Sequence, residues 1–243
     1  MNTDSIVDAA TQAGLGAYSE FIRQAAKETV DVRIVSGTAG LLESRFGGAP
    51  ALPPGFEWPK HDLGRYQFLG QINFSEIESA PPPLPSSGLL SLFFATDPDG
   101  EIFWGDPGYV LGYYFHDVAD LVPQASPEEP DPHVCKIALE SSVGLPSSPD
   151  LKLEYPFSGE DEDRFFYELP EKINAPTDYL LGYPSFNTLA YDPTPEGDWL
   201  SLITLRSHEQ LDWCWHDGDK LMVFIERQKL EGRDFSNLNC DAG

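Results

Sequence analysis

Apolar residues repeat with two different periods along this chain, and the period changes near residue 30. In residues 4–29 they recur at the i, i+3, i+4, i+7 spacing of a surface helix, interrupted at Gly14 and Gly16. This pattern predicts two short helices that cap a sheet. After Val30 the apolar residues come in short runs or at alternate positions, which is typical of strands. We therefore expect an α+β fold, mostly antiparallel β-sheet with helices at the N-terminal end.

Segments rich in proline, glycine and acidic residues separate the expected strands. Asp97-Pro98-Asp99-Gly100 lies between the apolar runs 89–94 and 102–104 and predicts a hairpin. Residues 123–133 and 158–163 predict loops, and the first is the expected boundary between two halves. Strands are expected at residues 32–36, 66–74, 89–94, 102–104, 109–115, 198–206 and 220–226. The chain is expected to be a single domain (1–243), with a helical cap (1–30), a first half (31–122) and a second half (134–243).

Two short motifs occur once in each expected half. Trp104-Gly105-Asp106 and Trp215-His216-Asp217 each precede an apolar run, and Gly48-Ala49-Pro50 is echoed by Gly182-Tyr183-Pro184. The repetition predicts an internal pseudo-duplication. In that case Trp104 and Trp215 start equivalent strands in two superimposable halves.

Charge narrows the classes of partner. The 243 residues include 40 acidic and 15 basic side chains, a formal net charge of −25. Such a surface repels phosphate backbones and anionic lipids, so nucleic acid and membrane partners are not expected. A cationic protein partner is favoured. Solubility alone is the competing explanation of the charge.

The cysteines and the N-terminal residues indicate a compartment. The chain has three cysteines, Cys135, Cys214 and Cys240, an odd number without the spacing of a metal site. A reducing compartment is the simpler interpretation. Neither a signal peptide nor an apolar run of about 18 residues is visible, so we expect a cytoplasmic protein.

Several turn motifs, taken in order, are similar to those of the YwqG-like family, a bacterial family of domains of unknown function. They include Phe46-Gly47-Gly48-x-Pro50, Glu57-Trp58-Pro59, Phe68-Leu69-x-Gln71-Ile72, Trp104-Gly105-Asp106-x-Gly108, Leu181-Gly182-Tyr183-Pro184 and Asp234-Phe235-Ser236. The chain departs from the family pattern at Trp215-His216-Asp217-Gly218-Asp219. The resemblance implies an antiparallel α+β body with an internal pseudo-duplication, and no established activity. An immunity role against a secreted toxin is implied by association.

Reactive motifs are scarce, so an enzyme is not favoured and no cofactor or metal is expected. Neither Gly-x-Ser-x-Gly nor a phosphate-binding glycine loop occurs. The leading hypothesis is a non-enzymatic module that binds a protein partner, such as a basic toxin, through acidic loops. The alternative is a small-molecule-binding or hydrolytic protein with a cleft between the halves. The candidate binding residues are Gln71, Asp106 and Asp217 for the cleft, and Glu160, Asp161, Glu162 and Asp163, with Glu128, Glu129 and Asp131, for the acidic surface.

Overall fold

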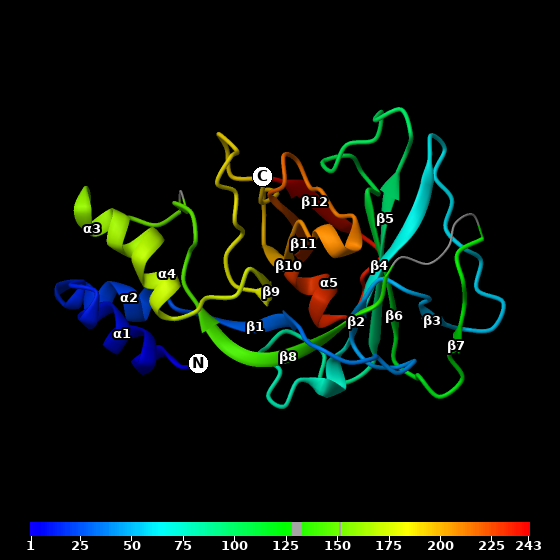
Figure 1. Cartoon of the computed structure of the whole chain (residues 1–243), viewed down its shortest axis with the longest axis horizontal. Helices are drawn as coiled ribbons and strands as arrows, with labels where there is room; N and C mark the ends of the chain where they lie inside the picture. Colours follow the sequence, from blue (N-terminus) through cyan, green and yellow to red (C-terminus); the bar gives the residue numbers. More distant parts are fainter. Residues whose placement is uncertain (128–132, 151) are drawn as a thin grey trace.

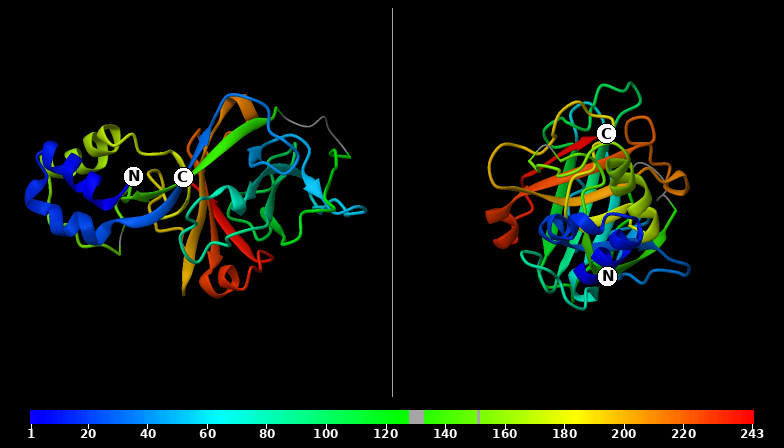
Figure 2. Two further views of the ribbon diagram at one scale, coloured as in Figure 1. Left: turned by 90° about the horizontal axis from the view of Figure 1, so that it is seen from below. Right: turned by 90° about the vertical axis from the view of Figure 1, so that its left-hand side faces the viewer.

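The computed structural model describes residues 1–127, 133–150 and 152–243. It consists of a helical part and a larger sheet part, which lie at opposite ends of the molecule (Figure 1; Figure 2, left). Strands β1 and β8 extend from the sheet toward the helices and connect the two parts.

The sheet part is built on ten strands, and every pairing between neighbours is antiparallel. A mostly antiparallel sheet was expected and is confirmed. In sheet order the strands are β12 (Leu238–Ala242), β11 (Lys220–Glu226), β10 (Trp199–Arg206), β9 (Asp178–Leu181), β1 (Lys27–Ile34), β8 (Cys135–Gly144), β2 (Arg45–Phe46), β4 (Arg65–Asn73), β5 (Leu89–Thr96) and β6 (Val110–Phe115). A separate pair is formed by β3 (Ala51–Leu52) and β7 (Val122–Pro123).

The sheet curls, so that its two edge strands approach each other. Phe235, just before β12, stacks on Tyr114 of β6 with ring centroids 5.5 Å apart. A side chain at Gly112 of β6 would collide with Leu238 of β12. The buried apolar residues of β4, β5, β10 and β11 form one continuous core inside this curl. Strands β5 and β11 are buried at nearly every position, hence on both faces, which explains their nearly continuous apolar sequences.

The helical part has its own smaller core. Ile6, Leu15 and Ile22 from the N-terminal helices pack with Phe165 and Leu169 of a later helical run, and all five are almost fully buried. The N-terminal helical elements are α1 (Thr3–Gln12), η1 (Gly16–Tyr18) and α2 (Ser19–Ala25). The later run, residues 160–172, comprises α3 (Glu160–Asp163), the π-helical η3 (Arg164–Glu168) and α4 (Leu169–Lys172). Shorter elements elsewhere are η2 (Phe74–Glu76), η4 (Glu209–Leu211) and α5 (Arg227–Glu231).

Two runs of four strands flank the central β1–β8 pair: β2–β4–β5–β6 on one side and β9–β10–β11–β12 on the other. Each run has a register shift at the corresponding strand, between Phe68 and Gly70 in β4 and between Ser201 and Ile203 in β10. The central strands are exchanged, because β1 lies beside β9 whereas β8 lies beside β2. The number of strands and the position of the register shift are thus the same on both sides of the central pair.

The two expected glycine turns occupy matching places in these runs. Gly47 and Gly48 follow β2 with φ of 66° and 72°, and Leu181 and Gly182 end β9 with φ of 60° and 80°. Backbone with positive φ favours glycine. At Gly47 a Cβ would also collide with the carbonyl oxygen of His133.

The tryptophan motifs do not match in this way. Trp104 lies in the loop between β5 and β6, whereas Trp215 lies between β10 and β11. Neither residue starts a strand, since β6 begins at Val110 and β11 begins at Lys220. The prediction that these tryptophans start equivalent strands is therefore wrong.

Two further predictions need correction. Residues 102–104 are not a strand, and β5 instead forms its hairpin with β6. The Asp97 carboxylate accepts the N–H groups of Glu101 and Ile102, so these donors are satisfied within the loop. Residues 160–163, expected in a loop, begin the helical run, where acidic side chains favour the first turn.

Candidate functional site

A hollow with a volume of about 590 Å³ lies between the helical run and the loop that follows β9. We call it the acidic groove. Glu162, Asp163 and Tyr167 of the helical run line one side, and Phe186 and Tyr191 line the other. It therefore lies where the helical part meets the sheet part (Figure 1).

The four acidic residues of α3 have two different roles. Asp161 accepts a hydrogen bond from the Tyr18 hydroxyl at 2.8 Å and pairs with Arg164, and Glu160 also lies 3.3 Å from Arg164. The Tyr18 hydroxyl and the Arg164 guanidinium lower the pKa of Asp161. Glu162 and Asp163 are exposed and have no ion-pair partner among the residues that the structure describes. They are the acids that face the groove.

Two exposed tyrosines stand at the same groove. The side chain of Tyr167 is 70% exposed and that of Tyr191 is 54% exposed. The Tyr191 hydroxyl donates to Asp241 at 2.7 Å, which holds this ring in place. Tyr167 lies in the π-helical turn, which also contains the buried Phe165 and Phe166. Single π-turns within helices are frequent at functional sites.

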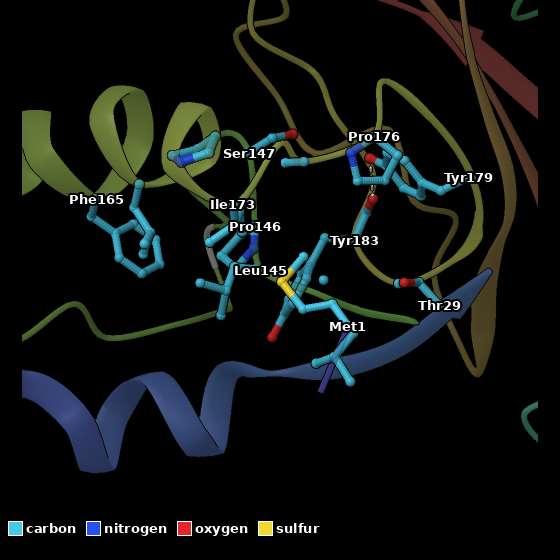
Figure 3. Close-up of a pocket in the computed structure, with 15 residues that line it drawn as sticks. Met1, Thr29, Leu145, Pro146, Ser147, Phe165, Ile173, Pro176, Tyr179 and Tyr183 are labelled. Carbon is cyan, nitrogen blue, oxygen red and sulfur yellow. Dashed lines mark hydrogen bonds between the residues drawn. The ribbon is translucent and has the colours of Figure 1, made fainter. Parts of the chain in front are cut away.

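A second, smaller hollow lies on the other side of the helical run, and we call it the junction pocket (Figure 3). Its volume is about 50 Å³. Met1, Leu145, Phe165 and Ile173 supply apolar walls. The sheet contributes Thr29 of β1 and Tyr179 of β9, and Tyr183 follows from the next loop.

Most polar groups of the junction pocket are already hydrogen-bonded. The Tyr179 hydroxyl donates to the carbonyl of Tyr183 at 2.9 Å, and the Tyr183 hydroxyl donates to the carbonyl of Ala25 at 2.8 Å. Burial raises the pKa of Tyr179 to about 12. Thr29 is different: it is 3% exposed, and its hydroxyl has no partner within the described part of the chain.

Gln71, a predicted binding residue, is completely buried in a structural network. Its amide nitrogen donates to the carbonyls of Leu41 and Glu43, and its amide oxygen accepts the N–H of Ala51. Arg45 lies beside it in the sheet and donates to four backbone carbonyls, those of Gly40, Leu41, Glu43 and Ala49. The network fixes the loop before β2.

Asp106 and Asp217 belong to two loops that approach each other. The Asp106 carboxylate accepts the N–H of Phe103 at 2.9 Å and so closes its own turn. The Asp217 side chain is 99% exposed, and its carboxylate lies 3.7 Å from His216 Nδ1. The Trp104 and His216 rings are in contact, with centroids 5.6 Å apart. The structure thus brings these two segments together, while Gln71 belongs to a different network.

The remaining motif residues lie in turns and packing contacts. The Trp58 indole, which precedes Pro59, donates to the carbonyl of Tyr66 and packs on Phe93. Tyr66 in turn donates to the carbonyl of Gly108, near Gly105. Trp215 is 3% exposed and packs on Phe94. Pro50 and Pro184 follow the positive-φ glycines Gly48 and Gly182.

Sequence reasoning missed several features. Asp178 and His208 form a pair at 2.9 Å with both side chains largely buried, and Asp178 also accepts the N–H of Arg206. Tyr167, Tyr191 and Thr29 gave no sequence signal, because their exposure or lack of a partner depends on tertiary packing. Among the described residues, no three His, Cys, Asp or Glu side chains gather as a metal site would need. The acids Glu128, Glu129 and Asp131 lie outside the described residues.

The family assignment rests on residues 44–242, which match the family described as "Domain of unknown function (DUF1963)". This chain belongs to the DUF1963 family. The DUF1963 segment contains every strand except β1, together with both sides of the acidic groove. A search of curated proteins gives no match.

The helices of the DUF1963 chain are short. None of them, in the part that the structure describes, has the length and apolar character needed to cross a membrane. The helical run is instead a wall shared by the groove and the pocket.

Proposed function

We propose that this chain is a non-enzymatic binding module, and that it holds a cationic segment of a partner protein in the acidic groove. One observation carries the proposal: Glu162 and Asp163 face the groove beside two exposed tyrosines, Tyr167 and Tyr191. The other acids of α3 are engaged by Tyr18 and Arg164. Unpaired carboxylates next to exposed aromatic rings are complementary to lysine and arginine side chains.

The groove offers such side chains two kinds of contact. The alkyl stem of a lysine packs on a tyrosine ring, and its ammonium group is attracted to the ring face by about 0.5–1 kcal/mol at an exposed site. The carboxylates of Glu162 and Asp163 supply the opposite charge. The net charge of −25 speeds the encounter with a cationic partner, and salt weakens this effect.

A more specific proposal concerns the biological setting. The motif resemblance to the YwqG-like family supports an immunity role, in which the partner is a basic toxin. Three free cysteines support a reducing compartment such as the cytoplasm. The excess of acidic residues argues against nucleic acid and anionic membranes as partners. A toxin gene adjacent to the gene for this chain is expected, and a metabolic operon in that place would count against the immunity role.

The alternative of a hydrolytic or small-molecule cleft between the halves remains a prediction without a supporting contact. Gln71 is used in the loop network and Asp106 in its own turn.

Internal duplication is also a proposal. The matching register shifts of β4 and β10 and the matching positive-φ turns at Gly48 and Gly182 support a common origin of the two strand runs. The tryptophan motifs do not support it, because they occupy different loops.

The test of the groove measures binding of a synthetic peptide of alternating lysine and glycine by isothermal titration calorimetry. The double variant Glu162→Gln/Asp163→Asn should bind about threefold to tenfold more weakly at low salt, and the difference should shrink as salt rises. A matched control, Glu78→Gln/Glu101→Gln, removes two exposed charges from the sheet part. Equal losses in the two double variants would show that only net charge matters and would overturn the proposal.

A further inference from the structure

We propose that Ser147 is a reactive serine, which Lys220 activates through Ser185, and that it takes up the acyl group of an uncharged activated ester. Ser147 lines the acidic groove and also the junction pocket (Figure 3). The reaction modifies the chain itself, with one acyl group on one side chain. It therefore adds to the binding role of the groove and does not depend on a cationic partner.

Three side chains from distant parts of the sequence form a continuous hydrogen-bond chain, which we call the serine–lysine relay. The Ser147 hydroxyl donates to the Ser185 hydroxyl oxygen at 2.9 Å, and the Lys220 ammonium donates to the same oxygen at 2.5 Å. Ser147 lies in the segment after β8, Ser185 lies in the loop after β9, and Lys220 is the first residue of β11. Ser185 is completely buried and Ser147 is half-buried, so the relay runs from the interior to the groove wall.

Lys220 is placed to act as the base of this relay. Among the described residues it forms no ion pair, and its ammonium group donates to Ser185. Burial lowers the pKa of Lys220, and Arg206 adds to this change. The carboxylates of Asp219 and Asp178 oppose it. A buried lysine that gives up its proton becomes a neutral amine, which is the form that serves as a general base.

The acylation step needs the relay and the ester alone. The Ser147 oxygen attacks the ester carbonyl while its proton passes to the Ser185 oxygen, and the Ser185 proton passes to the neutral Lys220 nitrogen. A bond forms between the Ser147 oxygen and the acyl carbon, and the bond from that carbon to the leaving oxygen breaks. The leaving oxygen takes the proton from the Lys220 ammonium and departs as a hydroxyl compound. A serine with a lysine as its base is an established form of activated nucleophile.

The groove determines which esters reach Ser147. Glu162 and Asp163 line the same hollow and repel an ester that carries a negative charge. The rings of Phe166 and Phe186 add apolar surface to its walls. An uncharged ester with a short acyl group therefore fits the site, and an anionic ester is disfavoured.

The experiment treats the full chain with p-nitrophenyl acetate and locates the acetyl groups by peptide mass spectrometry. An acetyl group on serine is an ester that hydroxylamine removes, which distinguishes it from acetyl on lysine. A hydroxylamine-labile acetyl group is expected on Ser147, and it should form faster than on the exposed Ser86. The neighbouring Ser148 is 2% exposed and accepts the N–H of Phe186, so it should not react. Acetylation of Ser147 no faster than that of Ser86 would overturn the proposal.

A matched pair of reagents tests the charge of the ester. N-Hydroxysuccinimidyl acetate is uncharged, and its sulfonated analogue delivers the same acetyl group with a negative charge. The anionic reagent should acetylate Ser147 several-fold more slowly, and Glu162→Gln/Asp163→Asn should narrow the gap. Equal rates with both reagents would overturn the selection of an uncharged ester. Because no peptide is used, the result is independent of the cationic partner proposed for the groove.

Three variants separate the relay from a purely structural network. Ser147→Ala should abolish the labile acetyl group without changing Tm. Lys220→Met should slow acetylation of Ser147 about a hundredfold, because a general base contributes about 10²–10⁴-fold. Lys220→Arg keeps the charge and the donors but does not release its proton, so it should be equally slow. In the unchanged chain the rate should rise with pH through a midpoint below the ordinary lysine pKa of 10.5. A rate that is unchanged in a folded Lys220→Arg variant would overturn the proposal.

Discussion

Two segments occupy corresponding places between the strands, but they differ in length and in secondary structure. Residues 35–44 connect β1 to β2, and residues 145–177 connect β8 to β9. The first segment is short and wraps around Arg45, whose guanidinium binds its carbonyls. The second contains the entire helical run and forms walls of both the acidic groove and the junction pocket. The two strand runs thus provide a scaffold, and the acidic groove and the junction pocket both lie against the longer of the two segments.

The difference extends to how polar groups are satisfied. The backbone carbonyls of the first segment accept hydrogen bonds from Arg45 of β2 and Gln71 of β4. Around the second segment, Glu162 and Asp163 are left without ion-pair partners among the described residues. A closed network stabilises a fold, whereas unmatched charges beside a groove are available to a partner.

The largest effect is expected where the two tryptophan segments are compared. Trp215→Ala should lower the free energy of unfolding by about 3–5 kcal/mol, because the indole is 3% exposed and packs on Phe94. Trp104 is only partly buried, so Trp104→Ala should cost distinctly less. Denaturant unfolding of both variants measures the difference. Equal losses would contradict the different roles that burial gives to Trp215 and Trp104.

Arg45→Met should lower the free energy of unfolding by about 2–4 kcal/mol, since the carbonyls around the guanidinium lose their donors in a buried site. Arg23→Met serves as the control and should cost less than about 1 kcal/mol, because the Arg23–Asp4 pair is exposed. Peptide binding in the groove should be unchanged in Arg45→Met. A similar small loss in both variants would mean that the hydrogen bonds of Arg45 to residues 35–44 do not stabilise the fold.

The strands with nearly continuous apolar sequence could be predicted well. Residues 66–74 and 198–206 were expected as strands and differ by one residue from β4 and β10, and β11 covers the expected 220–226. Burial on both faces makes such sequences uniformly apolar. The prediction of a hairpin strand at 102–104 was wrong because a short apolar run does not show which strand it would pair with. Here the N–H groups of Glu101 and Ile102 bind Asp97 rather than a strand.

The site was only partly accessible to sequence reasoning. Glu162 and Asp163 were named as binding candidates from their charge, but the sequence did not separate them from Asp161, which Tyr18 and Arg164 engage from elsewhere in the structure. Gly159 followed by four acids is also typical of a helix start, and the loop prediction overlooked it. The Thr29 hydroxyl lacks a hydrogen-bond partner because of how β1, β8 and the loop after β9 pack together. No local sequence pattern predicts this packing.

The smallest effect is a pH dependence that distinguishes Asp161 from its neighbours. Its pKa is lowered in the folded chain, so it stabilises the fold above its ordinary pKa of 3.8 and loses this contribution as the pH falls through the lower folded value. Asp161→Asn should therefore lower Tm at neutral pH, and its difference from the unchanged chain should vanish in strong acid. Glu162 has no ion-pair partner among the described residues, so Glu162→Gln is the control and should leave Tm at neutral pH unchanged. Thermal unfolding from pH 2 to pH 7 makes the measurement, and a pH-independent loss would contradict the role given to Asp161.

The central claim is that the acidic groove, between the helical run and the loop that follows β9, is the binding surface, and a map of peptide binding tests it most directly. The lysine–glycine peptide is titrated into ¹⁵N-labelled chain, and the backbone amide shifts are recorded. The account predicts that the largest shifts fall on Glu162, Asp163, Tyr167 and residues 186–191. Shifts centred on residues 35–50, or spread evenly over the acidic surface, would contradict it.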